Sequence, residues 1–569
     1  MTGHRLAPRR WGHLAGRALH YLRQDGLLAL LRRALAIAGP ELAPTLFGYG
    51  LWRRVYQTPR RSDLRAMRRH MASFARRPTF RVVALRPPTA QLLASLEAQL
   101  YCRWQLIEGL QTLPPADNDD YLVLLDGDEI LAPHALYMAA AALECDPGLD
   151  GLYADEDRLD QRDRHRAPLF KPDWSPNLLL GWDYIGGFVV LRQSLLTSVD
   201  KDAERPSAAS RYALLLSLAA GPKTPRIAHL PWILVHRRDE GDPGPQTAET
   251  MVLAATQHCR RLGLSAQVLP LPGRAGLRRV RLALPNPAPR VSVIIPTRDR
   301  VELLAQCVDG LLDATDYPDL EIIIVDNGSR AAETRAYLDK VAGLGVKVLR
   351  DDSPFNYAAL NNRAAAQASG QVLLLLNNDI KVIHGDWLTE MVGHALRADV
   401  GAVGAKLYFP DDTIQHAGVV IGLGGVAGHL HHGVARADSR AELHLLREVS
   451  AVTAACLATR AEVFRAVGGF DADRLAVAFN DVDLCLKIRR LGLKILWTPF
   501  AELYHFESAS RGSDLAPDKI ERFRTEHRAM QALWGATLAD DPFYSPNRTQ
   551  DGCDGGLAFP PRLVKPWAR

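Results

Sequence analysis

The chain has 569 residues, of which 47% are hydrophobic and 23% are charged. This composition is ordinary for a soluble globular protein, and the length allows two to four domains with sizeable cores. Sixteen arginines and three acidic residues fall within residues 1–77, so the net charge of +5 arises at the N-terminus and the remainder is net acidic. Seven scattered cysteines without a CxxC pair argue against a zinc site and favour a reducing compartment. No apolar run reaches the length of a membrane span, and we expect no secretory signal.

Residues 1–78 are predicted to be a basic helical segment. Apolar residues between Leu27 and Ile37 alternate with arginines such as Arg32 and Arg33, roughly as a helical stripe with a cationic border. Such a segment can lie on an anionic leaflet, where each basic residue contributes about 1 kcal/mol. We therefore expect residues 1–77 to contact an anionic membrane. Packing against the next domain is the alternative, and we expect no nucleic-acid partner.

Residues 79–240 are predicted to form a compact α/β unit. The apolar strand DYLVLLDGDEIL ends in Asp126 and Asp128, and the strand GLYADEDRLD carries Asp155. The strand RIAHLPWILVHRR closes the unit. Residues 241–290 are predicted to be a linker with one helix, because prolines follow that helix.

Residues 291–535 show the clearest organisation. The segments VSVIIPT, EIIIVDNGS, VKVLRDD and QVLLLLNNDI are typical of strands, and helix-length segments separate most of them. This alternation predicts a parallel sheet with helices on its faces. A helix is predicted over residues 480–491, with a buried face of Leu484, Cys485, Ile488 and Leu491. Residues 536–569, with several Pro and Gly, are predicted to be a surface tail.

The stretch QVLLLLNNDI is predicted to be a strand buried on both faces that ends in Asn377, Asn378 and Asp379. Open α/β sheets bind ligands at such strand ends, and a carboxylate there can hold a divalent metal on a phosphate. The same pattern ends at Asp126 and Asp128, 251 residues earlier. We infer a tandem duplication of one domain.

Three further residues are candidates for chemistry, each with a structural alternative. Asp326 ends a strand, where it either binds a base or ribose or forms an ordinary turn. Asp481 is either a general base or, after a predicted N-cap at Asn480, an acid that stabilises the helix dipole. His505 can complete a metal shell with Asp379, but a histidine there is more often structural.

A histidine cluster, His429, His431 and His432, lies in a Gly-rich segment. Its ordinary interpretation is a flexible exposed loop. Contact with an acceptor or a phosphate and a separate metal site are the alternatives.

Six motifs occur in one order over about 220 residues: VSVIIPTRDR, EIIIVDNGS, LLLLNNDI, VGGFD, FNDVDLCLKIRRLG and YHFESASRG. Together they resemble bacterial family 2 glycosyltransferases with the GT-A fold, of the type found in O-antigen and rhamnan synthesis. The resemblance implies inverting transfer of a sugar from a nucleotide-sugar donor. It also implies a divalent metal, Mn²⁺ or Mg²⁺, on the diphosphate.

Matched by position, the resemblance implies that Asp481 is the general base and that Asp379 and His505 are metal ligands. It implies donor contacts from Pro296, Thr297, Arg298, Asp326, Asn356, Asn361, Asn362 and Asn377. Two positions depart from the family's pattern. Asn377 replaces a carboxylate, so we expect the metal to be held more weakly, and Asn480 replaces a glutamate, which leaves Asp481 as the only carboxylate of its pair.

The first half resembles the same fold through DGDE, YADED, FKPDWSPN and HLPWILVHRR. Only 46 residues separate Phe80 from Asp126, against 86 between Val293 and Asp379, and nothing in between resembles DNGS. We therefore expect its nucleoside-binding half to be deleted and the domain to be inactive, although Asp126, Asp128 and Asp155 are retained. The expected fold class is α/β, with two tandem GT-A-like, Rossmann-like, mostly parallel domains, the first truncated, after a basic helical segment.

These expectations combine into a metal-dependent inverting glycosyltransferase of bacterial surface polysaccharide synthesis. It would be cytoplasmic, peripheral on the inner face of the cell membrane, with a glycan or lipid-linked glycan as acceptor. Two alternatives stay open: a bifunctional transferase in which both domains act, and a non-catalytic glycan-assembly scaffold. Asparagine at positions 377 and 480 favours the scaffold; the intact Asp326, Asp379, Asp481 and His505 oppose it.

Overall fold

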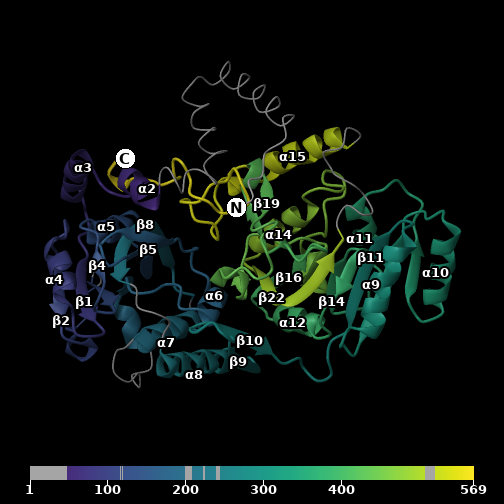
Figure 1. Cartoon of the computed structure of the whole chain (residues 1–569), viewed down its shortest axis with the longest axis horizontal. Coiled ribbons are helices and arrows are strands. Elements are labelled where there is room, and N and C mark those ends of the chain that lie inside the picture. Colours follow the sequence, from purple (N-terminus) through teal and green to yellow (C-terminus); the bar gives the residue numbers. More distant parts are fainter. Residues whose placement is uncertain are drawn as a thin grey trace, which may run out of the picture.

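The computed structural model describes residues 48–115, 117, 120–198, 208–221, 224–238, 244–506 and 519–568. The helical stripe predicted between Leu27 and Ile37 lies outside these residues. Figure 1 shows two α/β halves side by side along the long axis, each built around one sheet. None of the described helices has the length and apolar character that crossing a membrane requires.

The first half contains the following helices and strands: α2 (Tyr49–Tyr56), α3 (Arg61–Ala72), β1 (Thr79–Ala84), α4 (Ala90–Glu97), β2 (Trp104–Ile107), β3 (Asp120–Leu125), β4 (Ile130–Leu131), α5 (Ala135–Cys145), β5 (Gly151–Leu159), β6 (His165–Leu169), α6 (Pro176–Gly181), β7 (Val189–Arg192), α7 (Ala208–Ala219) and β8 (Ile227–Arg238). Its sheet has the order β2-β1-β3-β7-β5-β8-β4, with β6 paired to β5. Strand β1 is parallel to β2 and β3, and β7 is antiparallel to β3. Every residue of β3 is buried, as its continuous apolar run predicts.

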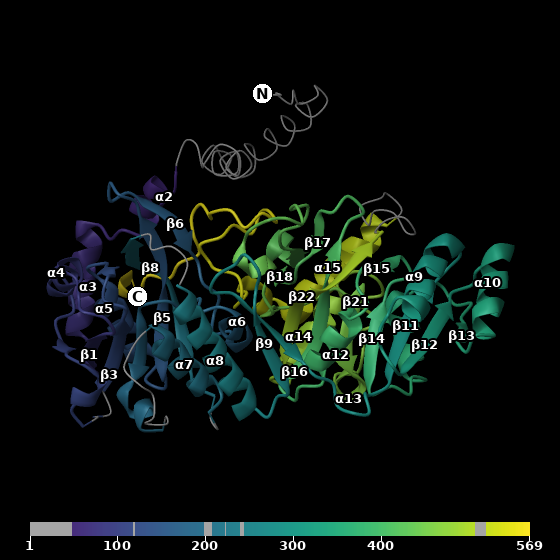
Figure 2. The ribbon, with the colours of Figure 1, turned by 60° about the horizontal axis from the view of Figure 1, so that its bottom comes forward.

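The predicted linker is an ordered bridge between the halves. It consists of α8 (Pro245–Arg261) and an antiparallel hairpin of β9 (Ala266–Pro270) and β10 (Arg278–Leu282). Figure 2 shows α8 against the first half and the hairpin next to the second. The sequence predicted the helix but not the hairpin, whose strands are short and flanked by prolines.

The second half contains these elements: β11 (Val291–Thr297), α9 (Val301–Asp313), β12 (Leu320–Asp326), α10 (Ala332–Ala342), β13 (Lys347–Arg350), α11 (Tyr357–Ala365), β14 (Val372–Leu376), β15 (Ile380–Val382), α12 (Trp387–Ala395), β16 (Val400–Tyr408), β17 (Ile414–His416), β18 (Val419–Ile421), β19 (Ala427–His429), β20 (Arg447–Glu448), β21 (Cys456–Arg460), α13 (Ala461–Ala466), α14 (Asn480–Arg490), β22 (Lys494–His505) and α15 (Ile520–Trp534). The main sheet has the order β13-β12-β11-β14-β21-β16-β22-β15, with β17 and β20 at its side. It is parallel from β13 to β14, but β21 is antiparallel to both of its neighbours, so the sheet is mixed and not mostly parallel as predicted.

The two halves share one sheet topology. Without β13, the order of the second sheet repeats that of the first, strand for strand and with the same pair directions. His236 on β8 pairs with Ile130 as His505 on β22 pairs with Ile380, which makes the two histidines counterparts. Both halves therefore have the tandem GT-A-like, Rossmann-type fold that the repeated strand pattern predicted.

The first copy lacks part of the edge that carries Asp326 in the second copy. In the described residues, no strand of the first sheet corresponds to β13. Strand β2, the counterpart of β12, ends at Ile107 opposite Val83, whereas β12 continues to Asp326 opposite Thr297. The first copy thus keeps β2 as the counterpart of β12, but this strand ends before the position that Asp326 takes in the second copy.

The described residues 536–568 differ from the surface tail predicted for 536–569, because they are packed against both halves. The yellow C-terminal segment in Figure 1 returns from the second half to the first. Asp541 accepts a hydrogen bond from the Ile421 N–H of the second half, and the fully buried Asn547 donates to Asp155 of the first. The Pro- and Gly-rich composition indicated an irregular backbone correctly, but it gave no information on burial.

Two details of α14 also differ from expectation. The N-cap is Phe479, which has a left-handed backbone with φ of 61°, and Asn480 is the first helical residue. Leu484, Cys485 and Ile488 are buried as predicted, but Leu491 follows the helix and is 52% exposed. The helix ends one residue earlier than its apolar periodicity suggested.

Candidate functional site

The polar residues that follow β14 lie in the middle of the second sheet. All five residues of β14 are buried, and the strand lies between β11 and β21. Asn377, Asn378 and Asp379 therefore emerge at the carboxyl end of the parallel strands. Asn378 donates a hydrogen bond of 2.9 Å to the Thr297 hydroxyl at the end of β11, which fixes the two strand ends to each other.

Asp379 and His505 face each other across this edge. The antiparallel pairing of β15 with β22 brings them together, and His505 Nε2 lies 3.1 Å from Asp379 Oδ1. His505 Nδ1 donates to Gln415 Oε1 at 2.6 Å, because an amide oxygen can only accept. Asn377 Nδ2 lies 3.1 Å from His505 Nε2, which fits an imidazole lone pair at Nε2. Gln415 thus fixes the tautomer in which Nε2 is a ligand atom.

This arrangement fits a divalent metal. Asp379 Oδ1 is buried and, among the described residues, has no hydrogen-bond partner. A carboxylate oxygen and an imidazole lone pair that face each other at 3.1 Å repel unless a cation lies between them. Oxygen and imidazole nitrogen are the ligands that Mn²⁺ accepts in proteins. The structure thus brings Asp379 and His505 together, and their role as metal ligands stays a prediction.

Asp326 is held by groups of its own domain. It is 2% exposed, accepts a hydrogen bond of 2.9 Å from the Ser329 N–H and lies 2.5 Å from Arg350 Nη1 on β13. Arg350 is half-exposed and also contacts Asp352. The sequence did not identify Arg350, although it ends the strand next to β12 and is positioned to contact a ligand at this edge.

The other predicted donor residues near β11 differ in exposure. Pro296 and Thr297 are buried, and Arg298 is exposed. The next residue, Asp299, accepts hydrogen bonds from the N–H groups of Arg330 and Ala331 and thereby joins the loops that follow β11 and β12. Arg298 thus begins a loop that is anchored beside Asp326.

The amides of Asn356, Asn361 and Asn362 are used within the domain. Asn356 caps α11 by accepting from the Ala359 N–H. Asn362 binds both backbone groups of Phe470, at 2.9 Å each. Asn361 is fully buried and donates to the Tyr357 carbonyl. These bonds give all three residues a structural role, and their contact with a donor stays a prediction.

Asp481 lies in the first turn of α14 and faces the same region. It is half-buried, and its carboxylate accepts hydrogen bonds from the N–H groups of Ala454 (3.1 Å) and Val482 (2.8 Å). Burial raises the pKa of Asp481 above its ordinary value of 3.8, and these hydrogen bonds oppose the rise only in part. A raised pKa suits a group that accepts a proton.

The Tyr357 side chain connects the Asp379 edge to Asp481. Its hydroxyl lies 3.1 Å from the Ala454 carbonyl and 3.4 Å from Asn377 Oδ1. The Ala454 N–H in turn donates to Asp481. Tyr357 and Gln415 were missed by the sequence analysis, because each lies far along the chain from the groups it contacts and carries no motif of its own.

The loop that precedes α14 is held by α15. The buried Glu526 accepts hydrogen bonds from the N–H groups of Val477 (2.9 Å) and Ala478 (3.1 Å). The first helical residue, Asn480, is also buried and donates to the Val477 carbonyl. Position 480 therefore anchors the loop that leads into Asp481.

The histidine cluster of the Gly-rich segment does not form one site. His429 Nδ1 lies 3.0 Å from Nδ1 of the buried His416. Burial and then the neighbouring His429 hold the pKa of His416 far below its ordinary value. His431 instead contacts Arg440, and His432 meets Phe409 edge to face. Together, these contacts disfavour a single metal site of His429, His431 and His432.

In the first half, the corresponding carboxylates are neutralised by arginines. Asp126 forms ion pairs with the buried Arg211 and, at 2.9 Å, with Arg237. Burial opposes ionisation, but these two guanidinium groups hold the pKa of Asp126 below its ordinary value. Asp128 pairs with Arg86 at 2.9 Å. Although Asp126, Asp128 and Glu129 are close enough to share one cation, arginines already supply the positive charge.

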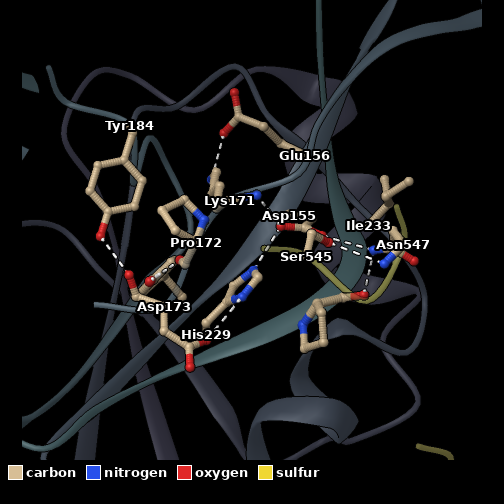
Figure 3. Close-up of polar contacts among 12 residues, drawn as sticks. Asp155, Glu156, Lys171, Pro172, Asp173, Tyr184, His229, Ile233, Ser545 and Asn547 are labelled. Carbon is tan, nitrogen blue, oxygen red and sulfur yellow. Dashed lines mark hydrogen bonds and ion pairs between the residues drawn. The ribbon is translucent and has the colours of Figure 1, made fainter. Parts of the chain in front are cut away.

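Asp155 is likewise used inside the protein. Figure 3 shows it between His229, at 2.7 Å, and Asn547 of the C-terminal segment, at 3.1 Å. Burial alone would lower the pKa of His229, but the carboxylate of Asp155 raises this pKa to about 9. Beside them, Lys171 pairs with Glu156 at 3.1 Å. Every acidic group of this cluster that Figure 3 labels has a partner within the chain.

The counterpart of His505 has different partners. His236 Nδ1 binds Asp157 at 2.6 Å, and Asp157 also contacts His165, the Tyr49 hydroxyl and Arg53. Asp157, His165 and His236 are close enough for one metal ion. However, Arg53 lies 3.5 Å from both Asp157 Oδ2 and His236 Nε2, and its positive charge opposes a cation there.

Comparisons with known proteins find a family match within the second half and relatives along most of the chain. Residues 292–467 match the model of Glycosyl transferase family 2. An uncharacterised protein of Sinorhizobium fredii is 41% identical over 453 residues, 77% of this chain and 50% of that protein. The O-antigen biosynthesis protein RfbC of Myxococcus xanthus is 34% identical over 600 aligned residues, 96% of this chain and 46% of that protein. The chain thus spans about half the length of these curated relatives.

Solved glycosyltransferases show more distant likeness. A mannosyltransferase of Pyrobaculum calidifontis, in complex with GDP-mannose and Mn²⁺, is 19% identical with a TM-score of 0.34, and the match covers 52% of this chain and 74% of that one. The structure of GalNAc-T7 with UDP, GalNAc and Mn²⁺ is 16% identical with a TM-score of 0.37, covering 44% and 50%. On the family match, residues 292–467 in the second half of this chain carry a domain of Glycosyl transferase family 2.

Proposed function

We propose that the second half transfers a sugar from a nucleotide-sugar donor to a hydroxyl group of a bacterial surface glycan, with inversion at the anomeric carbon. The observation that carries this proposal is the juxtaposition of a metal-type pair, Asp379 and His505, with a partly buried carboxylate, Asp481. Tyr357 contacts Asn377 on one side and the Ala454 backbone that binds Asp481 on the other. The O-antigen assignment of the relative RfbC supports a glycan acceptor.

The residues divide into a donor side and an acceptor side. Asp326, Thr297 and Arg350 would contact the nucleoside, and Asp379 and His505 would hold a divalent metal. Such a metal supplies positive charge that stabilises a diphosphate as it leaves. Asp481 takes the proton of the acceptor hydroxyl. The acceptor oxygen then attacks the anomeric carbon on the face opposite the diphosphate, and the bond from that carbon to the diphosphate breaks. This direct displacement inverts the anomeric carbon and needs one base only.

We propose that the first half is a non-catalytic copy, against the bifunctional alternative. Arg211, Arg237 and Arg86 neutralise Asp126 and Asp128, and β2 ends at Ile107, short of the position that Asp326 takes at the end of β12. We propose domain bounds of 79–240 for this copy and 291–535 for the catalytic domain, with 536–569 as a C-terminal segment. Membrane contact of residues 1–77 and a cytoplasmic location stay predictions.

Calorimetry against a panel of nucleoside diphosphates, with and without Mn²⁺ or Mg²⁺, tests this function directly. We expect one or two diphosphates to bind only when the metal is present. If no diphosphate binds the full chain under either condition, the non-catalytic scaffold replaces the transferase.

A further inference from the structure

A second polar cavity lies on the second half, apart from Asp379. It has a volume of about 310 Å³ and opens between the turn of the β9–β10 hairpin and the strands β16 and β22. Its charged and titratable lining comprises Arg274, Lys406, Arg436, His444 and Glu502. Glu502 and His505 are three residues apart on β22, so their side chains leave opposite faces of the strand. The cavity is therefore separate from the metal pair.

Lys406 is the unusual member of this lining. It is only 3% exposed, and its Nζ donates to the Leu443 carbonyl at 3.1 Å and lies 5.3 Å from the centre of the Tyr408 ring. Among the described residues, no carboxylate lies within ion-pair distance of it. Burial, and then the neighbouring guanidinium groups, lower the pKa of Lys406 to about 8 against the opposing effect of Glu502. The ammonium form thus predominates at neutral pH.

The acidic group of the cavity is already engaged. Glu502 accepts a hydrogen bond from the Tyr408 hydroxyl and pairs with Arg436 at 3.3 Å. Arg274 donates to the Ser439 carbonyl at 2.8 Å and, in the described part of the chain, has no carboxylate partner. Two positive charges, those of Lys406 and Arg274, therefore converge on the cavity, and no carboxylate of the described residues lies within ion-pair distance of either.

Buried charges in proteins are normally paired, because taking an ammonium group out of water is costly. Lys406 has the Leu443 carbonyl and the Tyr408 ring but no carboxylate at ion-pair distance among the described residues, and the cavity offers room for an anionic group. Ammonium and guanidinium donors are the usual partners of phosphate oxygens. We propose that this cavity binds a phosphoryl group, held by Lys406 and Arg274, in addition to the diphosphate of the nucleotide donor.

The phosphoryl group has two possible sources, free phosphate and a phosphorylated glycan. Both present the same oxygens to the two cations. The cavity volume of about 310 Å³ accommodates a phosphate together with part of an attached sugar. The proposal goes beyond the transfer reaction, and it does not require Asp379 or Asp481 to take part.

Protection of Lys406 from acetylation tests the proposal in the full chain without any substitution. The protein is acetylated with limiting acetic anhydride at pH 8, and the labelling of Lys406 is quantified by mass spectrometry. Inorganic phosphate is titrated against sodium chloride of equal ionic strength, with the exposed Lys340 as the internal reference. We expect a saturable decrease of at least fivefold at Lys406 and no change at Lys340. No protection at Lys406, or equal protection by chloride, would overturn the proposal.

Further arms identify the source and the second cation. Stronger protection by glucose 1-phosphate than by inorganic phosphate supports a phosphorylated glycan, and the reverse supports free phosphate. Protection by glucuronate without protection by either phosphate would overturn the phosphoryl assignment. The variant Arg274→Met should need at least fivefold more phosphate, whereas Arg281→Met on the same hairpin should behave as the natural chain. Equal phosphate requirements for the two variants would overturn the role of Arg274.

Discussion

His505 Nε2 lies 3.1 Å from Asp379 Oδ1, and no group in the described part of the chain donates a hydrogen bond to that carboxylate oxygen. Gln415 accepts the proton of His505 Nδ1, so in the neutral imidazole an electron pair at Nε2 faces the carboxylate oxygen. A cation between them removes this repulsion. The relationship gives the strand end of β14 a specific chemical role, and it leads to the first two predictions.

The variant His505→Ala should weaken Mn²⁺-dependent binding of the nucleoside diphosphate at least tenfold, because it removes one of two metal ligands. Isothermal titration with the metal in excess measures the change. The matched control is His236→Ala, the counterpart in the first half, which should leave the affinity unchanged. A loss of equal size in both variants would contradict the assignment of the metal to the second half.

The variant Asn377→Asp should tighten the binding of Mn²⁺ about tenfold, since a second carboxylate adds charge beside Asp379. Paramagnetic resonance of free Mn²⁺ during a titration gives the dissociation constant. Unchanged or weaker metal binding would show that position 377 lies outside the metal shell.

Transfer should depend on pH through Asp481. Because burial raises its pKa, the carboxyl binds a proton at a higher pH than an ordinary aspartate, for which the value is 3.8. Transfer should therefore be full above this raised pKa and fall tenfold per pH unit below it, as the base becomes protonated. The sign for stability is opposite: protonation favours the folded state, so acidification through this pKa should not destabilise the protein through Asp481. A profile of kcat/KM against pH without an acid limb would exclude Asp481 as the base.

Substitutions in the first half should affect stability rather than transfer. The variant Asp126→Asn leaves the buried Arg211 and Arg237 with less compensation and should cost about 3 kcal/mol of unfolding free energy. The more accessible Asp128 pairs with one arginine, and Asp128→Asn should cost less than about 1 kcal/mol. Denaturant unfolding gives both values, and transfer per folded molecule should equal that of the natural chain. A loss of transfer by Asp128→Asn at full stability would instead support a bifunctional enzyme.

The sequence predicted the strands and the duplication well, because the apolar runs of β3 and β14 are long and end in the same polar pattern. It also predicted the proximity of Asp379 and His505, which the pairing of β15 with β22 produces. It could not predict Gln415, Tyr357 or Arg350, whose roles depend on contacts between distant segments. The packed C-terminal segment was missed for a similar reason: Asn547 is buried by groups from the first half, and irregular backbone has no periodicity that reveals burial.

The most direct test of the central claim is the transfer rate of Asp481→Asn beside that of Asp483→Asn, with donor binding measured on both. Asp483 lies in the same helical turn but pairs with Lys487 and Trp534, away from the site. We expect Asp481→Asn to lower kcat at least 100-fold with the dissociation constant of the nucleoside diphosphate within twofold of the natural chain, and Asp483→Asn to retain transfer. Full transfer by Asp481→Asn, or loss of donor binding together with transfer, would contradict the account.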